Sequence, residues 1–152
     1  MSELIVSKWL NTTSDVSLDT LRGNVVLVYA FQMLCPACVI HSIPQANKIH
    51  QRFAHEKLQV LGIHTVFEHH EAMKEQSLKA FLHEFRVKFP VAIDKPDVNS
   101  NIPHTMRKSS MQGTPTLLIY DKMGELKLHR FGHVDDLELG FIIGSILSED
   151  IV

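Results

Sequence analysis

Seven consecutive apolar residues, Val25 to Phe31, constrain the fold of this chain most strongly. Two cysteines follow this run within a few residues. The run is rich in β-branched residues and does not alternate with polar ones. A strand with this pattern is typically buried on both faces, as in an α/β sheet that helices cover. We therefore expect a central strand here and helices after it.

The rest of the chain alternates between strand-like and helix-like segments. The expected strands span residues 4–10, 25–31, 58–67, 89–94, 116–120 and 125–131. Helices are expected near 18–21, from Pro36 onward with a kink at Pro44, around 78–85 and over 137–147. The turn 121–124 joins the last two strands and predicts an antiparallel hairpin. This order of elements predicts an α/β fold with a mixed sheet.

Size and charge limit the domain organisation and the partners. The 152 residues fit one domain, 1–152, and 15 basic against 17 acidic residues give a net charge of −2. No basic cluster exceeds residues 106–108, so we expect neither nucleic acid nor a membrane as a partner. No apolar run approaches the roughly 20 residues of a membrane span, and the first residues lack the pattern of a secretory signal. The expected location is the cytoplasm.

The two cysteines, Cys35 and Cys38, form a C-x-x-C motif between the central strand and a helix. A thiol at the first turn of a helix is exposed, and the unpaired N–H groups there favour its thiolate form. Pro36 suits the first helical position, because its missing N–H needs no partner there. Cys38 lies one turn on, faces inward and is expected to stay protonated longer. The motif therefore predicts that Cys35 attacks a substrate disulfide and that Cys38 resolves the mixed disulfide that forms.

Two other interpretations of the cysteines remain, a buried structural pair and half of a zinc site. A closed zinc site needs four ligands, and no second C-x-x-C or spaced pair of histidines supplies the others. Val39 follows Cys38 where covalent haem attachment needs histidine. We expect no metal and no cofactor other than a redox-active Cys35–Cys38 disulfide.

Several short segments, in their order and spacing, resemble the thioredoxin fold. They are residues 21–28, the Cys35–Cys38 frame, Phe89-Pro90-Val91, Gly113-Thr114-Pro115-Thr116 and 121–125. More narrowly the chain is similar to the redoxin branch, which holds the alkyl hydroperoxide reductase/thiol-specific antioxidant (AhpC/TSA) group and thioredoxin-like reductases of cytochrome c maturation. The resemblance covers about residues 16–147. It implies a three-layer thioredoxin-like fold, a central mixed sheet flanked by helices, with an N-terminal extension.

The resemblance also implies roles for individual residues. Pro115 matches the cis-proline that packs beside the active-site disulfide, and Thr114 would offer its backbone to a substrate peptide. With the residues between the cysteines, Pro36 and Ala37, these two are the expected substrate-binding residues. Pro44 matches a helix-kinking proline of the family.

The chain departs from the family at three positions. Leu34 stands where tryptophan usually precedes the first cysteine, and Tyr29 stands where thioredoxins have a buried aspartate that relays a proton. His41 stands where the cytochrome-maturation relatives have glutamate. A histidine about one turn from Cys38 is a candidate for proton transfer. The alternative is a half-exposed helix histidine without a role.

A second group of polar residues follows the strand expected over 58–67. The group comprises His64, Glu68, His69, His70 and Glu71. It permits three interpretations: a metal site, a substrate groove lined by His64 or Glu68, and a solvated polar loop.

These observations predict a thiol-disulfide oxidoreductase. Its substrate would be a disulfide-containing protein or a small thiol, and another dithiol would reset the motif. One alternative is a peroxiredoxin-like thiol peroxidase with antioxidant activity, although Gln32 and Val28 stand where its pocket needs a hydroxyl and a proline. The other is a non-enzymatic copper-binding protein that adds a histidine such as His129 or His133 to the thiolates. Such copper proteins separate their cysteines by three residues rather than two.

Overall fold

The central strand expected from the sequence lies in the middle of one mixed sheet of six strands. In this computed structural model, which describes residues 3–149, the strands run in the order β1-β4-β3-β2-β5-β6. Their bounds are β1 Val6–Leu10, β2 Val25–Phe31, β3 Leu58–His64, β4 Val91–Asp94, β5 Thr116–Tyr120 and β6 Leu126–Phe131. β2 pairs with β3 in parallel and with β5 antiparallel. β1 adds the expected N-terminal extension to the sheet edge, antiparallel to β4.

Every residue of β2 is buried, and alternate residues enter two different cores. The odd-numbered residues, such as Leu27 and Tyr29, pack on one face of the sheet. The even-numbered residues, such as Val28, pack on the other. The continuous apolar pattern is therefore correctly interpreted as a strand covered on both faces.

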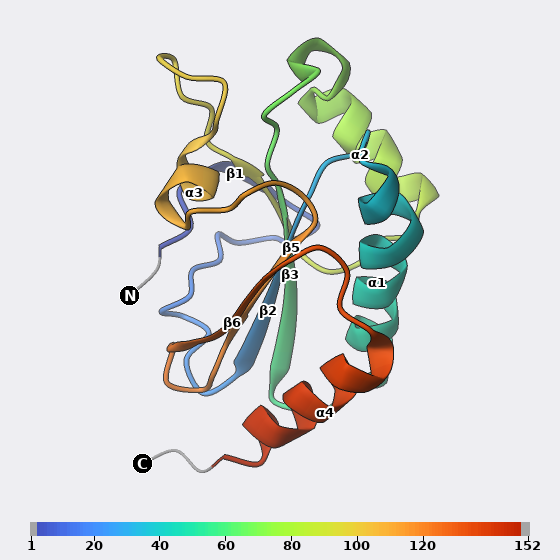
Figure 1. Cartoon of the computed structure of the whole chain (residues 1–152), viewed down its shortest axis with the longest axis vertical. Helices are drawn as coiled ribbons and strands as arrows, with labels where there is room; N and C mark the ends of the chain where they lie inside the picture. The colour runs from blue at the N-terminus through green and yellow to red at the C-terminus, as the bar shows by residue number, and fades with distance from the viewer. Residues whose placement is uncertain (1–2, 150–152) are drawn as a thin grey trace.

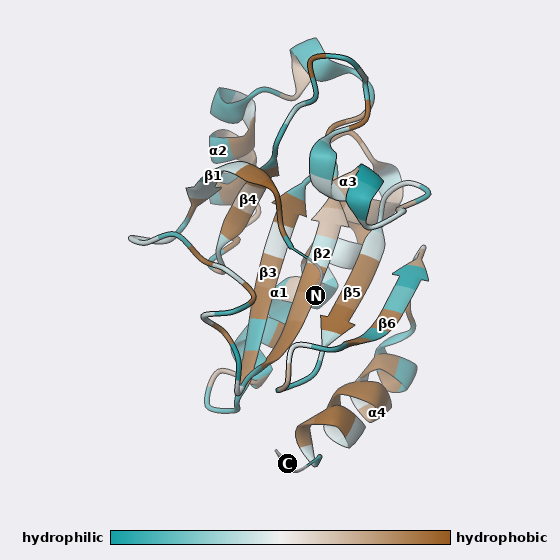
Figure 2. Cartoon of the chain, turned by 90° about the vertical axis from the view of Figure 1, so that its left-hand side faces the viewer, coloured by the Kyte–Doolittle hydropathy of each residue, from teal (hydrophilic) through white to brown (hydrophobic). Residues whose placement is uncertain are grey.

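Helices cover both faces of the sheet (Figure 1). α1 (Ile43–Arg52), α2 (Glu75–Glu84) and α4 (Asp136–Leu147) lie on one face, and α3 (His104–Lys108) lies on the other. Figure 2 shows apolar residues concentrated along β2, β3 and β5. This arrangement confirms the predicted α/β thioredoxin-like fold. No helix among the described residues is long and apolar enough to span a membrane.

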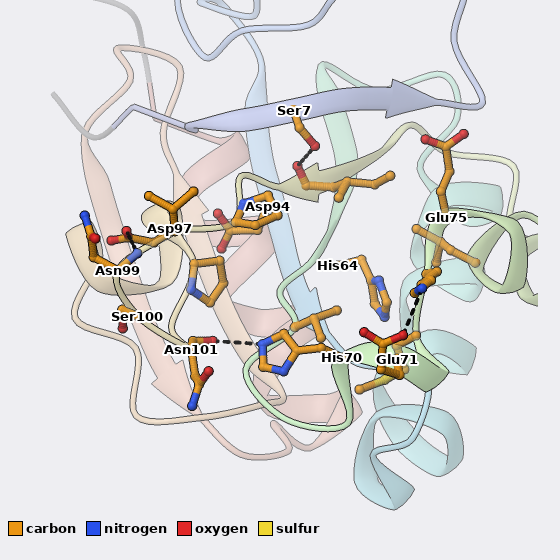
Figure 3. A pocket seen from close by; sticks show the side chains of 18 residues that line it. Ser7, His64, His70, Glu71, Glu75, Asp94, Asp97, Asn99, Ser100 and Asn101 are labelled. Atoms are coloured by element: carbon orange, nitrogen blue, oxygen red, sulfur yellow. Dashed lines mark hydrogen bonds and ion pairs between the residues drawn. The ribbon is translucent and has the colours of Figure 1, made fainter.

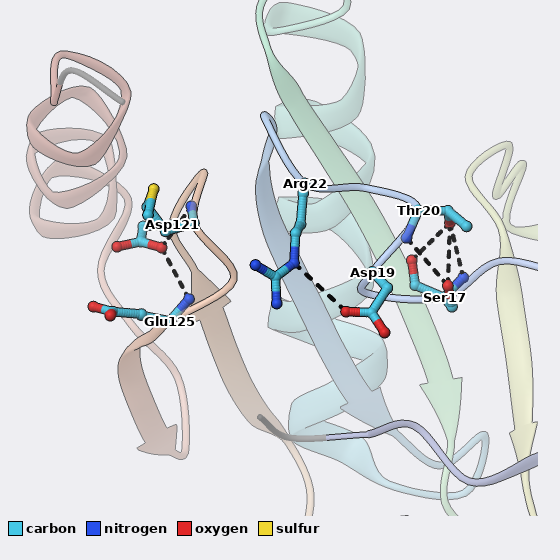
Figure 4. Close-up of polar contacts among 7 residues, drawn as sticks. Ser17, Asp19, Thr20, Arg22, Asp121 and Glu125 are labelled. Carbon is cyan, nitrogen blue, oxygen red and sulfur yellow. Dashed lines mark hydrogen bonds and ion pairs between the residues drawn. The ribbon is translucent and has the colours of Figure 1, made fainter. Parts of the chain in front are cut away.

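The helix expected near 18–21 is a hydrogen-bonded turn instead. Ser17 and Thr20 bond to each other through hydroxyls and backbone, with the Thr20 hydroxyl donating to the Ser17 carbonyl at 2.9 Å (Figure 4). Such local side-chain bonds compete with helix formation. The strand expected over 58–67 also ends earlier, at His64, because the Phe67 N–H donates to the Gln32 side chain rather than to a neighbouring strand.

The kink expected at Pro44 takes the form of a π-helical turn directly before it. Helical backbone begins at Pro36 and passes through this turn, Cys38–Ser42, into α1. Pro44 has no N–H and its ring would clash with the carbonyl four residues earlier. The wider turn accommodates the proline, since the Ile43 N–H donates to the Cys38 carbonyl.

α3 is an α-helix that the sequence did not predict, and a distant residue caps it. Its N-cap position is Pro103, which makes no side-chain cap bond. The Asp94 carboxylate, at the end of β4, accepts the Thr105 N–H at 2.7 Å and the Met106 N–H at 3.0 Å. The Thr65 hydroxyl donates to the same carboxylate at 2.7 Å. Asp94 is buried, so one side chain joins the ends of β3 and β4 to α3.

Asp94→Asn should lower the free energy of unfolding by roughly 1–3 kcal/mol, because an amide cannot accept all three donors and leaves buried groups unpaired. Urea denaturation measures this change. Asp15→Asn, at an exposed aspartate, is the control and should stay within about 0.5 kcal/mol of the original protein. Equal stability of the two variants would contradict the capping role.

Candidate active site

The two cysteines lie where β2 gives way to the helix, as the sequence predicts. The Cys35 carbonyl accepts the Val39 N–H at 3.1 Å, so Cys35 stands at the start of the helical backbone. Cys35 is partly exposed, whereas Cys38 is fully buried. Pro36 between them is exposed and Ala37 is half-buried. The structure therefore gives the two thiols the difference in exposure that was expected.

The sulfur atoms are 2.6 Å apart, with the Cys38 thiol donating to Cys35. The Cys38 N–H also points at the Cys35 sulfur, at 3.4 Å. Burial raises the pKa of the Cys38 thiol to about 12, and its hydrogen bond with Cys35 acts in the same direction. Cys38 is thus held protonated next to a sulfur that receives two donors.

The segment that contains Thr114 and Pro115 lies against the exposed sulfur. The Thr114–Pro115 peptide bond is cis, as the resemblance implies. The Cys35 thiol contacts the Thr114 carbonyl at 3.5 Å. Pro115 is buried and Thr114 is half-buried. Of the expected substrate-binding residues, Pro36, Ala37 and Thr114 therefore present accessible surface near the dithiol, whereas Pro115 does not. The role of these residues in binding stays a prediction.

Gln32 fixes the loop before the cysteines to two other segments. Its side chain is buried, donates to the Thr114 hydroxyl at 3.3 Å and accepts the Phe67 N–H at 3.2 Å. The Gln32 amide therefore occupies the position where a peroxidase would have a hydroxyl. Its nitrogen and its oxygen each already make a hydrogen bond. In the sequence Gln32 stands out only as a departure from the peroxidase pattern, and nothing there indicates this bridging role.

Two further side chains contact the same loop, and neither contact was predicted. His64 Nε2 accepts the Met33 N–H at 3.3 Å, and Met73 Sδ accepts the Leu34 N–H at 3.4 Å. Both partners are buried. Nothing in the sequence indicates Met73, whereas His64 belongs to the polar group that the sequence places after the strand expected over 58–67.

That group separates into residues with different surroundings. His64 is buried at the end of β3, while Glu68, His69, His70 and Glu71 are exposed. His64, His70 and Glu71 line a cavity of about 770 Å³ that neither cysteine lines (Figure 3). Glu68 does not line this cavity, so of the two candidates for a substrate groove His64 is the one that borders it. Within residues 3–149 no three histidine, cysteine or acidic side chains gather closely enough to hold a metal ion.

The side chain of His41 lies beside another histidine. It is exposed, and its ring stacks on His133 with ring centres 4.5 Å apart. Tyr29, in place of the family's aspartate, donates its hydroxyl to Gln45 at 2.9 Å in the core. Transfer of the Cys38 proton to His41 stays a prediction.

The difference in burial predicts unequal reactivity of the thiols. Cys35 in a Cys38→Ser variant should react with iodoacetamide at pH 7.5 at least about tenfold faster than Cys38 in a Cys35→Ser variant, because burial keeps Cys38 protonated and inaccessible. Mass spectrometry of quenched samples gives both rates. Similar rates would show that the two thiols are equally accessible.

Comparisons with known proteins agree with this geometry. Residues 7–129 match the AhpC/TSA family model, while no curated protein matches the chain. Among solved structures, a thioredoxin-like superfamily protein shares 51% identity, with 99% of this chain and 97% of that chain covered and a TM-score of 0.95. A thiol-disulfide isomerase from Corynebacterium glutamicum shares 48% identity, with coverage of 97% and 96% and a TM-score of 0.94.

A thioredoxin-like protein in its oxidised form, at 21% identity, covers 97% of this chain and 94% of its own with a TM-score of 0.79, which supports the fold alone. The family model covers most of the chain, and the cysteine pair with the cis-proline stands at the site that the resemblance implied. The chain therefore belongs to the AhpC/TSA family and has a thioredoxin-like fold.

Proposed function

We propose that the protein is a thiol-disulfide oxidoreductase in which Cys35 is the nucleophile and Cys38 the resolving thiol. One observation carries this proposal. The partly exposed Cys35 stands at the start of a helix and beside the cis-proline segment, and its sulfur lies 2.6 Å from the sulfur of the fully buried Cys38. The solved relative named as a thiol-disulfide isomerase supports the same class of reaction.

The reaction balances as two thiol-disulfide exchanges. The Cys35 thiolate attacks one sulfur of the substrate disulfide, forms a mixed disulfide and releases the other sulfur as a thiolate that takes up a proton. The Cys38 thiol then gives up its proton and attacks the Cys35 sulfur, which breaks the bond between Cys35 and the substrate. The departing substrate sulfur takes up a proton and leaves as the second thiol. The substrate disulfide has become a dithiol, and the Cys35–Cys38 dithiol has become a disulfide. An external dithiol reverses the change in the protein.

The contacts around the cysteines suit this order of events. Two donors from Cys38, its N–H and its S–H, point at the Cys35 sulfur, which favours negative charge there. The high pKa of Cys38 keeps it from competing as a nucleophile until the mixed disulfide forms. Thr114 would then align a substrate peptide beside Cys35 through its backbone. The substrates proposed are disulfide-containing proteins, with a cytoplasmic dithiol as reductant.

Reduction of insulin disulfides in the presence of dithiothreitol tests the proposal. The original protein should accelerate insulin precipitation, and Cys35→Ser should abolish the acceleration because no nucleophile remains. Cys38→Ser should instead accumulate a mixed disulfide with the substrate that non-reducing gels and mass spectrometry detect. Ser42→Ala, a buried residue on the same helical turn outside the dithiol, is the control and should retain activity. Acceleration that persists in Cys35→Ser would contradict the assignment.

A further inference from the structure

The loop between β2 and the cysteines leaves the sheet, so its N–H groups need other partners. Met33 and Leu34, the two residues before Cys35, donate instead to side chains from a separate part of the chain, His64 and Met73. A buried N–H without a partner costs free energy comparable to a lost hydrogen bond. Met33 is half-buried whereas Leu34 is exposed, so we expect the His64 acceptor to matter more than Met73 for the conformation that presents Cys35.

The His64 acceptor is held rigidly. His64 is the last residue of β3, and the parallel register places it beside Phe31, the last residue of β2. Its ring packs against the Phe31 ring, with ring centres 5.2 Å apart, and its side chain is 1% exposed. The pairing of two central strands thus delivers an imidazole to the start of the cysteine loop.

The imidazole is in the protonation state that the contact requires. Burial lowers the pKa of His64 to about 4, so the ring is neutral at physiological pH. Because Nε2 accepts the Met33 N–H, the ring proton is on Nδ1. His64 also borders the 770 Å³ cavity (Figure 3), which neither cysteine lines.

We propose that His64 is a positioning residue for the reactive thiol: its Nε2 holds Met33 so that the loop aims the Cys35 sulfur at the N–H and S–H of Cys38. The inference rests on the proposed function in that Cys35 is taken as the reacting thiol. Without the acceptor, the loop is free to move the Cys35 sulfur away from these donors. Its thiolate then loses stabilisation.

Two substitutions at His64 separate the hydrogen bond from the packing. His64→Leu removes the acceptor but keeps an apolar side chain, whereas His64→Gln keeps an acceptor near the position of Nε2. The matched control is His70→Leu, because His70 lines the same cavity but bonds to the Asn101 carbonyl at 3.1 Å instead of to the cysteine loop. The measurement is the rate of Cys35 alkylation by iodoacetamide against pH on the reduced protein.

His64→Leu should slow alkylation of Cys35 at pH 7 by about threefold to tenfold, as expected for one lost hydrogen bond, and shift the pH profile upward. His64→Gln should recover most of the rate, and His70→Leu should stay within about twofold of the original protein. A His64→Leu profile identical to that of the original protein would overturn the proposal. So would equal losses in the leucine and glutamine variants, since packing alone would then explain them.

A measurement on the original protein covers the case in which His64→Leu does not fold. Hydrogen exchange by NMR should show the Met33 amide protected well beyond an exposed loop amide, and the His64 nitrogen shifts should place the ring proton on Nδ1. Exchange of Met33 at the rate of a free amide would refute the inference. Neither readout involves a disulfide substrate, so failure of the proposed function shows separately, as absence of insulin reduction.

Discussion

The burial of β2 on both faces is the constraint on which the rest of the structure depends. Because helices and loops cover both sides of this strand, its chain path cannot shift, and the point where it leaves the sheet is fixed. The cysteine loop begins at that point. Parallel pairing with β3 then brings Phe31 beside His64, so the same register that builds the core also places a side chain next to the loop.

The site gains its chemical asymmetry from burial rather than from charged neighbours. Cys35 and Cys38 are one helical turn apart, yet Cys35 is partly exposed and Cys38 is buried in the core. Enclosure keeps Cys38 protonated, and a protonated Cys38 is a hydrogen-bond donor to Cys35. The segment around Thr114 closes the other side of the exposed sulfur. A dithiol in this setting has a distinct first and second nucleophile.

The sequence predicts correctly those elements that depend on residues close together in the chain. β2 and β5 have the expected bounds, because continuous apolar and β-branched residues specify a buried strand, and the cysteine pair was placed correctly between strand and helix. α3 escaped prediction because its cap, Asp94, is ten residues earlier and reaches it only in the folded sheet. The contacts of Met33 and Leu34 could not be predicted from the sequence for the same reason. Their partners, His64 and Met73, become neighbours only through strand register and the chain path after it.

Cys35 and Cys38 are proposed to form one reversible dithiol–disulfide couple. Equilibration with glutathione buffers of defined ratio, followed by acid quench and mass determination, tests it directly. We predict a single two-electron transition, with a midpoint in the range of about −270 to −120 mV that spans thioredoxin-like couples, and its loss in Cys38→Ser. Thiols that remain reduced across this range, or that form only mixed disulfides with glutathione, would contradict the account.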